Sequence, residues 1–251
     1  MACADFARKV IANSTTGALA AILIEPIQGT AGNIVPPPEF MPAVKAIARE
    51  NDALLISDEM ITGFGRTGRW FGCEHSGVVP DVLTIGKGLG SGFPVSGLVS
   101  TDAITHAKPW GNPSGSSSSY GGNPMAGAAA YASVTVIEEE GLVENAAQVG
   151  EWMLHRLKEM QERHEFIGHV QGKGLLIGVE LVKDRITREP LDRAVCRRLF
   201  QESLRRGLIS MVYSPHFRVN PALSIDRPTA ETMLGILDEV FEQVGREGHW
   251  K

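Results

Sequence analysis

A lysine and an aspartate in this chain each follow a short apolar run and precede or enter a glycine-rich turn. Lys87 lies in TIGKGLG, residues 84–90, and Asp58 ends the run LLISD, residues 54–58. In open α/β sheets, ligands bind outside the carboxyl ends of the strands. A lysine there can form a Schiff base with a carbonyl cofactor, and an aspartate can keep a pyridine nitrogen protonated. These are the two groups that pyridoxal phosphate chemistry needs.

Two other interpretations fit the same spacing. A lysine in a glycine-rich turn can be a solvated charge or a phosphate contact, because a motif match of this kind is weak by itself. Asp58 and Glu59 after an apolar strand could also hold Mg²⁺, as in nucleotide hydrolases. The chain has no GxxxxGK(S/T) run to bind the phosphates. The nucleotide-hydrolase interpretation therefore loses its main support.

The composition indicates a globular protein with a hydrophobic core. The chain has 251 residues, of which 43% are hydrophobic and 21% are charged. A net charge of −5 without a basic block disfavours nucleic acid as a partner. No apolar run is long enough to span a bilayer and no signal peptide is recognisable, so we expect no membrane partner and a cytoplasmic location. The three cysteines are scattered, which argues against a disulfide framework, and no histidine pair has metal-ligand spacing, so we assign no metal.

The first half of the chain predicts strands and helices in alternation. Near-continuous apolar runs predict buried strands at residues 18–25, 53–57, 82–85 and 95–100. Residues 38–50 predict a helix, with proline at its start and apolar residues at helical spacing. Residues 1–17 resemble a short helical lead-in. This order indicates α/β layers around a mostly parallel sheet.

The second half predicts a smaller α/β unit. Residues 108–122 are rich in Gly, Pro and Ser, and we expect them to form an ordered active-site loop before a helix at 124–139. The remaining predicted helices are 142–164, 191–206 and 229–246, and the remaining predicted strands are 175–182 and 218–223. We therefore predict a partial large domain over residues 1–140 and a small domain over 141–251.

Six motifs occur in a specific order. They are IEPIQGTAG (24–32), DEMITGFGRTG (58–68), TIGKGLG (84–90), SYGGNP (119–124), GKGLLIGVEL (172–181) and FRVNPAL (217–223). Together they resemble the class III, or omega, aminotransferases of pyridoxal phosphate (PLP) fold type I, from about Ala18 to the C-terminus. The resemblance implies an α/β fold, PLP as cofactor, and amino transfer between an amino donor and an oxo acid such as pyruvate or 2-oxoglutarate.

The resemblance also implies a role for individual residues. Lys87 would carry the cofactor and move the proton, and Asp58 would hold the pyridine nitrogen. Ser119, where the family more often has Thr, would bind the cofactor phosphate of a neighbouring subunit. Gln28 would lie near the cofactor ring. Arg218 would bind the substrate carboxylate through two parallel hydrogen bonds.

Two positions depart from part of the family. The 4-aminobutyrate and ornithine enzymes carry Glu at the position of Thr30 and often Gln at the position of Ile61. Ile61, which we count among the cofactor-binding residues, resembles the amine:pyruvate and β-alanine:pyruvate branch. Glu59 we interpret as structural.

A complete family member has a long N-terminal portion that binds the cofactor phosphate and stacks an aromatic ring on the pyridine. We therefore expect a second chain to supply that half, within a homo- or hetero-oligomer. A truncated fragment and an inactive homologue remain open. The functional alternatives are other PLP chemistry on this fold, such as racemisation or decarboxylation, and a non-catalytic interaction or regulatory subunit.

Overall fold

The protein divides into two compact units. The computed structural model describes residues 2–248 and 250. The first unit contains the chain up to Pro26 together with Pro36–Phe64 and Trp70–Glu140. The second contains Ile27–Val35, Gly65–Arg69 and the chain from Gly141 onward. Two short segments of the first half of the sequence therefore pack within the second unit, and no sequence signal indicates this.

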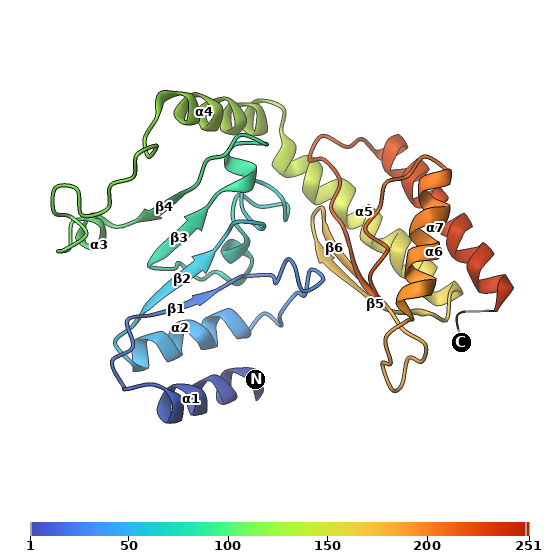
Figure 1. Ribbon diagram of the computed structural model, residues 1–251, viewed down its shortest axis with the longest axis horizontal. Coiled ribbons are helices and arrows are strands. Elements are labelled where there is room, and N and C mark those ends of the chain that lie inside the picture. The colour runs from blue at the N-terminus through green and yellow to red at the C-terminus, as the bar shows by residue number, and fades with distance from the viewer. Residues whose placement is uncertain (1, 249, 251) are drawn as a thin grey trace. The chain divides into compact units, whose positions relative to one another are not determined.

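The first unit is built on a four-stranded sheet. Its strands are adjacent in the order β1 (Ala21–Ile24), β2 (Leu54–Asp58), β3 (Val82–Ile85) and β4 (Gly97–Ser100) (Figure 1). Strands β1, β2 and β3 are parallel, and β4 is antiparallel to β3. The predicted mostly parallel sheet is confirmed. Because parallel strands point the same way, β2 and β3 deliver the residues that follow them to one edge of the sheet.

A helix packs on this sheet, and a second helix packs on the first. Helix α2 (Phe40–Glu50) packs Val44 and Ala48 against Leu55 of β2. Helix α1 (Ala2–Ser14) lies beside α2 (Figure 1), where Arg8 pairs with Glu50 at 2.9 Å. The remaining helical segments of this unit are η1 (Gly72–Ser76), η2 (Lys87–Leu89), α3 (Asp102–Thr105) and α4 (Pro124–Glu139). Helix α4 has its predicted bounds because Asn123 caps its N-terminus, accepting a hydrogen bond from Ala126 N, and Pro124 follows the cap.

Part of the sheet surface is apolar and exposed. Leu23 of β1 is 62% exposed, and Leu98 and Val99 of β4 are 42% and 50% exposed. The prediction that the first strand is covered on both faces is therefore wrong for the described residues. The physical reason is that successive side chains of a strand point to opposite faces. Ile22 and Ile24 pack against the core cluster that includes Val44 of α2, whereas Leu23 points to the other face.

The second unit combines an antiparallel sheet with three helices. The strands run in the order β5 (Ile167–Lys173), β6 (Leu176–Leu181) and β7 (His216–Val219), and the helices are α5 (Leu142–Arg163), α6 (Arg193–Arg205) and α7 (Arg227–Glu247). Large, fully buried side chains such as Met153, Phe217 and Phe241 join the helices to the sheet in one core. Strand β7 begins two residues before its predicted start and ends at Val219.

Candidate functional site

Asp58 and Thr84 bring the ends of β2 and β3 together. Asp58 is the last residue of β2 and pairs in register with Thr84 of β3, three residues before Lys87. Asp58 Oδ1 accepts hydrogen bonds from Thr84 Oγ1 at 3.3 Å and from Met60 N at 3.0 Å. Both bonds end on Oδ1, so among the described residues Oδ2 is left for a further donor. The half-buried carboxylate is thus fixed in place with one oxygen unoccupied.

Lys87 opens the short helix η2 in a left-handed backbone conformation, with φ of +43°. Non-glycine residues rarely adopt this conformation, and such strain concentrates at functional sites. The flanking glycines make room: a Cβ on Gly86 would lie 2.5 Å from Met60 Cε, and one on Gly88 would lie 3.1 Å from Phe64 Cβ. Within the described part of the chain, the exposed Lys87 ammonium makes no hydrogen bond or ion pair. It is therefore available to a ligand.

Glu59, next to Asp58, has a different environment. Its fully buried carboxylate accepts hydrogen bonds from Gly72 N at 2.7 Å, Cys73 N at 2.8 Å, Ser57 Oγ at 3.2 Å and the Thr62 hydroxyl. Four donors saturate both oxygens and close the loop between β2 and η1. This agrees with a structural role for Glu59.

Cys73, on the same loop, is not a nucleophile candidate. Burial raises the pKa of its thiol to about 12, and the neighbouring Glu59 carboxylate acts in the same direction. A thiol with this pKa stays protonated near neutral pH, whereas the thiolate is the reactive form. Cys73 is therefore not a reactive group at this edge of the sheet.

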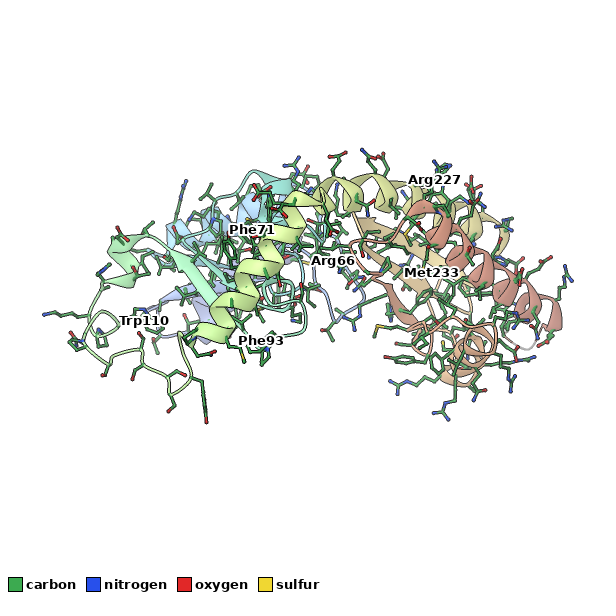
Figure 2. All side chains as sticks on the ribbon, turned by 90° about the horizontal axis from the view of Figure 1, so that it is seen from above. Arg66, Phe71, Phe93, Trp110, Arg227 and Met233 are labelled. Atoms are coloured by element: carbon green, nitrogen blue, oxygen red, sulfur yellow. The ribbon has the colours of Figure 1, made fainter. Side chains whose placement is uncertain are left out.

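The two other predicted residues of the first unit lie in loops. Ile61 is half-buried in the loop that follows β2. Ser119 is exposed in the segment between α3 and α4, which also carries Trp110 (Figure 2). Its neighbour Ser118 accepts hydrogen bonds from the N–H groups of Gly121 and Tyr120 at 3.2 and 3.4 Å. The Ser119 hydroxyl has no protein partner among the residues described, which leaves it free to donate.

Gln28 and Arg218 belong to the second unit. Gln28 is exposed, and its backbone pairs with Ile34 to form a small loop with Thr30 within it. Arg218 lies on β7 opposite Gly178 of β6. Its guanidinium contacts Met211 Sδ at 3.7 Å, and no carboxylate of a described residue pairs with it. Arg218 could therefore bind a carboxylate ligand without first breaking an ion pair with a described residue.

The structure thus groups the predicted residues by unit, with Asp58, Ile61, Lys87 and Ser119 in the first and Gln28 and Arg218 in the second. Three surface cavities of 560–590 Å³ are lined by residues of the second unit and include none of these six. Over residues 2–248 and 250, no cluster of three His, Cys, Asp or Glu side chains could hold a metal ion. In the same residues no helix has the length and apolar character that crossing a membrane requires.

The sequence does not indicate two further donors, the buried Asn33 and the half-buried Arg66. Asn33 and Arg66 bind the backbone of the second unit, close in sequence to Gln28 and Ile61 respectively. Both lie inside motifs or next to them, but a motif string does not reveal which carbonyl groups a side chain reaches. No local signal could have identified their partners.

Comparison with known proteins identifies the family to which this chain is similar. The family model for aminotransferase class-III matches residues 1–241. The chain is 41% identical to a leucine/methionine racemase of Thermococcus litoralis, over 92% of this chain and 52% of that protein. It is also 41% identical to an alanine/serine racemase of Pyrococcus horikoshii, over 89% of this chain and 46% of that protein.

A solved structure agrees with these relatives. An amine transaminase from an uncultivated Pseudomonas species, in a PLP-bound form, superposes with a TM-score of 0.89 at 35% identity, over 97% of this chain and 56% of that one. This chain spans about half the length of each protein named here. Fold type I, predicted from the motifs, is confirmed, as is the dependence of the family on PLP. The chain belongs to the class III aminotransferase family.

Proposed function

We propose that this chain is the lysine-bearing part of a PLP-dependent aminotransferase. In this proposal an amino group passes from a donor to an oxo acid such as pyruvate or 2-oxoglutarate. The observation that carries it is the pair of strand ends at which Asp58 Oδ2 and the Lys87 ammonium both lack a protein partner among the described residues. Family membership supports the same conclusion.

These side chains suit the ring and the carbonyl of PLP. When bound, PLP makes the proton on the substrate α-carbon acidic by drawing electrons into its ring. Lys87 would hold the cofactor covalently and, once free, would carry the proton to and from the substrate. Asp58 would keep the pyridine nitrogen protonated. Gln28 and Ile61 would contact the ring, and Ser119 would donate to the phosphate of a neighbouring subunit's cofactor.

Arg218 would hold the carboxylate of the substrate. A planar guanidinium makes two parallel hydrogen bonds to a carboxylate, which fixes the orientation of the substrate as well as its charge. The absence of a paired carboxylate among the described residues supports this role, because a competing ion pair would first have to break.

A second candidate function is amino-acid racemisation. Both relatives that are 41% identical to this chain are named racemases. Racemisation uses the same lysine and aspartate, but the proton returns to the opposite face of the α-carbon and no oxo acid is consumed. Incubating the protein with L-alanine alone distinguishes the two functions. Formation of D-alanine would support a racemase. Formation of a new amino acid only after a pyruvate analogue or another oxo acid is added would support an aminotransferase.

We further propose that a segment equivalent to the N-terminal half of the relatives completes the cofactor site. A phosphate needs several converging N–H and O–H donors, often at a helix N-terminus, and Ser119 offers only one. The exposed apolar residues of β1 and β4 would be covered by the added strands.

The test is co-expression of this chain with such an N-terminal segment, followed by borohydride reduction and peptide mapping. We expect the cofactor to be fixed on the peptide that contains Lys87, and Lys87→Ala to abolish the label and turnover. Lys108→Ala, which changes an exposed lysine of the loop before α4, should leave both intact. A label on another lysine would contradict the proposed role of Lys87 as the residue that holds the cofactor covalently. Stoichiometric PLP and full activity in this chain alone would contradict only the need for a partner.

A further inference from the structure

The strand that carries Arg218 is weakly held by its own sheet. Strand β7 has four residues, His216–Val219, and it is an edge strand that pairs with β6 alone. The residues that follow it, 220–225, form no helix or strand. A short edge strand that continues into an irregular segment needs other contacts to fix the direction of its side chains.

Asn33 supplies one such contact from the segment Ile27–Val35. Its fully buried side chain donates through Nδ2 to Asn220 Oδ1 at 2.7 Å and to Ile177 O at 2.8 Å. The residue has a left-handed φ of +55°, and its own Oδ1 is buried without a partner among the described residues. An amide kept buried with one oxygen unsatisfied indicates that its two donated bonds are what the site requires.

Arg66 supplies a second contact from the segment Gly65–Arg69 (Figure 2). Its Nη1 donates to Pro221 O at 2.6 Å and to Leu175 O at 3.4 Å. No carboxylate of a described residue pairs with this guanidinium, and burial lowers its pKa from the ordinary value. Arginine is normally buried with an acidic partner, so an arginine that binds only backbone carbonyl groups here indicates a positional role.

Asn145 of α5 holds the far end of the same segment. Its Nδ2 donates to Leu223 O at 2.6 Å and to Ile225 O at 3.0 Å. Arg66 and Asn145 thus hold backbone carbonyl groups between Pro221 and Ile225, and Asn33 holds the side chain of Asn220 against the backbone of β6. Asn33 and Arg66 contact Asn220 and Pro221, the first two residues after β7.

We propose that Arg66 and Asn33 are positioning residues that orient Arg218 toward the carboxylate of the substrate. Arg218 makes no ion pair that would fix its guanidinium, so its direction depends on where the backbone of β7 lies. The two tethers set that backbone immediately after the strand. This inference rests on the proposed function, because it requires a substrate that carries a carboxylate.

The test is Arg66→Lys in the protein co-expressed with the N-terminal segment proposed above. Lysine keeps the charge, but its ammonium sits on a shorter side chain than Nη1 of arginine, so it should not reach Pro221 O and Leu175 O. We expect the KM for pyruvate to rise about tenfold, while kcat and KM for a primary amine without a carboxylate, such as 1-aminobutane, change less than twofold. In an Arg218→Lys background the same substitution should add no further loss, because residues that act through one group are not additive.

Asn33→Gly is a second, independent variant. Glycine tolerates the left-handed backbone of this position, so the substitution removes the two donated bonds without adding strain. We expect the same selective rise in the KM for pyruvate. This variant tests the inference even if Arg66→Lys does not fold.

Arg185→Lys is the matched control. Arg185 also donates to backbone carbonyl groups within the second unit, those of His164, Glu165 and Ile167, but it does not contact the segment after β7. It should leave the KM for pyruvate unchanged. Equal changes for both substrates, or full additivity with Arg218→Lys, would show that Arg66 and Asn33 are only structural. A parent protein without any PLP-dependent turnover would contradict the proposed function and this inference with it.

Discussion

Two adjacent carboxylates, Asp58 and Glu59, differ in what surrounds them. Asp58 is half-buried and accepts two hydrogen bonds on one oxygen, whereas Glu59 is fully buried and accepts four. A carboxylate with an unoccupied oxygen can bind a ligand, and a saturated one can only hold the chain together. Substitution to the matching amide should separate these roles.

Asp58→Asn should lower turnover by about 10²-fold or more, which corresponds to roughly 2.7 kcal/mol in the activation free energy. A neutral amide no longer favours the protonated pyridine. The free energy of unfolding should change little, since the amide oxygen still accepts from Met60 and Thr84. Steady-state kinetics and urea unfolding of the same sample check both statements. Near-normal turnover would contradict the role of Asp58.

Glu59→Gln should have the opposite effect. One oxygen becomes an NH₂ group, which faces a backbone N–H whichever way the amide turns, because Gly72 and Cys73 each donate to one of the two oxygens. A buried donor left without an acceptor lowers the free energy of unfolding by about 1–3 kcal/mol. Urea unfolding measures this loss of stability. An unchanged unfolding midpoint would mean that the loop between β2 and η1 rearranges so that no buried N–H group is left without an acceptor.

At the scale of elements, Asp81 joins α2 to the sheet. Its Oδ2 accepts from Lys45 Nζ of α2 at 2.6 Å and from Leu55 N of β2 at 2.7 Å. Burial alone would raise the pKa of Asp81, but the Leu55 N–H and the Lys45 ammonium outweigh it, so the pKa lies below its ordinary value. A carboxyl group with a lowered pKa stabilises the folded state above its unfolded pKa of about 3.9.

The contribution of Asp81 should therefore be complete at neutral pH and lost as the pH falls through its lowered folded pKa. Asp81→Asn should reduce the free energy of unfolding at pH 7 by about 1 kcal/mol, a value discounted for partial exposure. As the pH falls through the folded pKa, wild-type Asp81 also becomes protonated, so the difference between wild type and variant should shrink progressively. Urea unfolding at a series of decreasing pH values measures this difference, and a difference that stays constant would contradict the assignment.

Two glycines inside helices of the second unit should respond in opposite ways to the same change. A Cβ on Gly150 of α5 would lie 2.1 Å from the carbonyl carbon of Gly174, whereas a Cβ on Gly235 of α7 would meet nothing within 4 Å. Gly150→Ala should destabilise the unit by about 2–3 kcal/mol, because the backbone of Gly174 must move. Gly235→Ala should stabilise it by up to about 1 kcal/mol through helix propensity. Thermal unfolding of both variants measures the two changes in stability, and changes of the same sign would contradict the prediction.

Elements with a local sequence signal could be predicted, whatever their length, and an element without one could not: the four-residue β3 has its predicted bounds, whereas the seven-residue β5 does not follow from its sequence. Helix α4 has its predicted bounds because its cap and its proline are local signals. Strand β5 was missed because IGHVQGK mixes apolar residues with His, Gln, Gly and Lys, so it forms a strand only by pairing with β6. Lys87 and Asp58 could be predicted because strand ends are local. The partners of Asn33 and Arg66 could not, since they lie between 109 and 187 residues away along the chain.

At the scale of the molecule, the exposed apolar side chains of the edge strands should control association. Val99→Lys places a charge on β4, where Val99 is 50% exposed. Charge on an edge strand opposes pairing with another chain. We expect this variant to self-associate less when expressed alone and to co-purify poorly with the N-terminal segment. Size-exclusion chromatography and co-purification measure the two effects.

Val79→Lys is the control for that substitution. Val79 is 82% exposed but lies in the loop before β3, so it should change neither property. If Val99→Lys assembled as well as the wild type, β4 would not be part of the surface that receives the added segment.

The segments Ile27–Val35 and Gly65–Arg69 leave the ribosome long before the strands that receive them. The hydrogen bond from Asn33 to Asn220 spans 187 residues, and that from Arg66 to Pro221 spans 155. Contacts this distant in sequence form late, because the loop they close must first be ordered. A nascent chain that stops before Asn220 already contains β2, β3, Asp58 and Lys87, but it lacks the residues after β7 to which Asn33 and Arg66 bind. The residues that would hold the cofactor are therefore synthesised well before the contacts that would orient the arginine for the substrate.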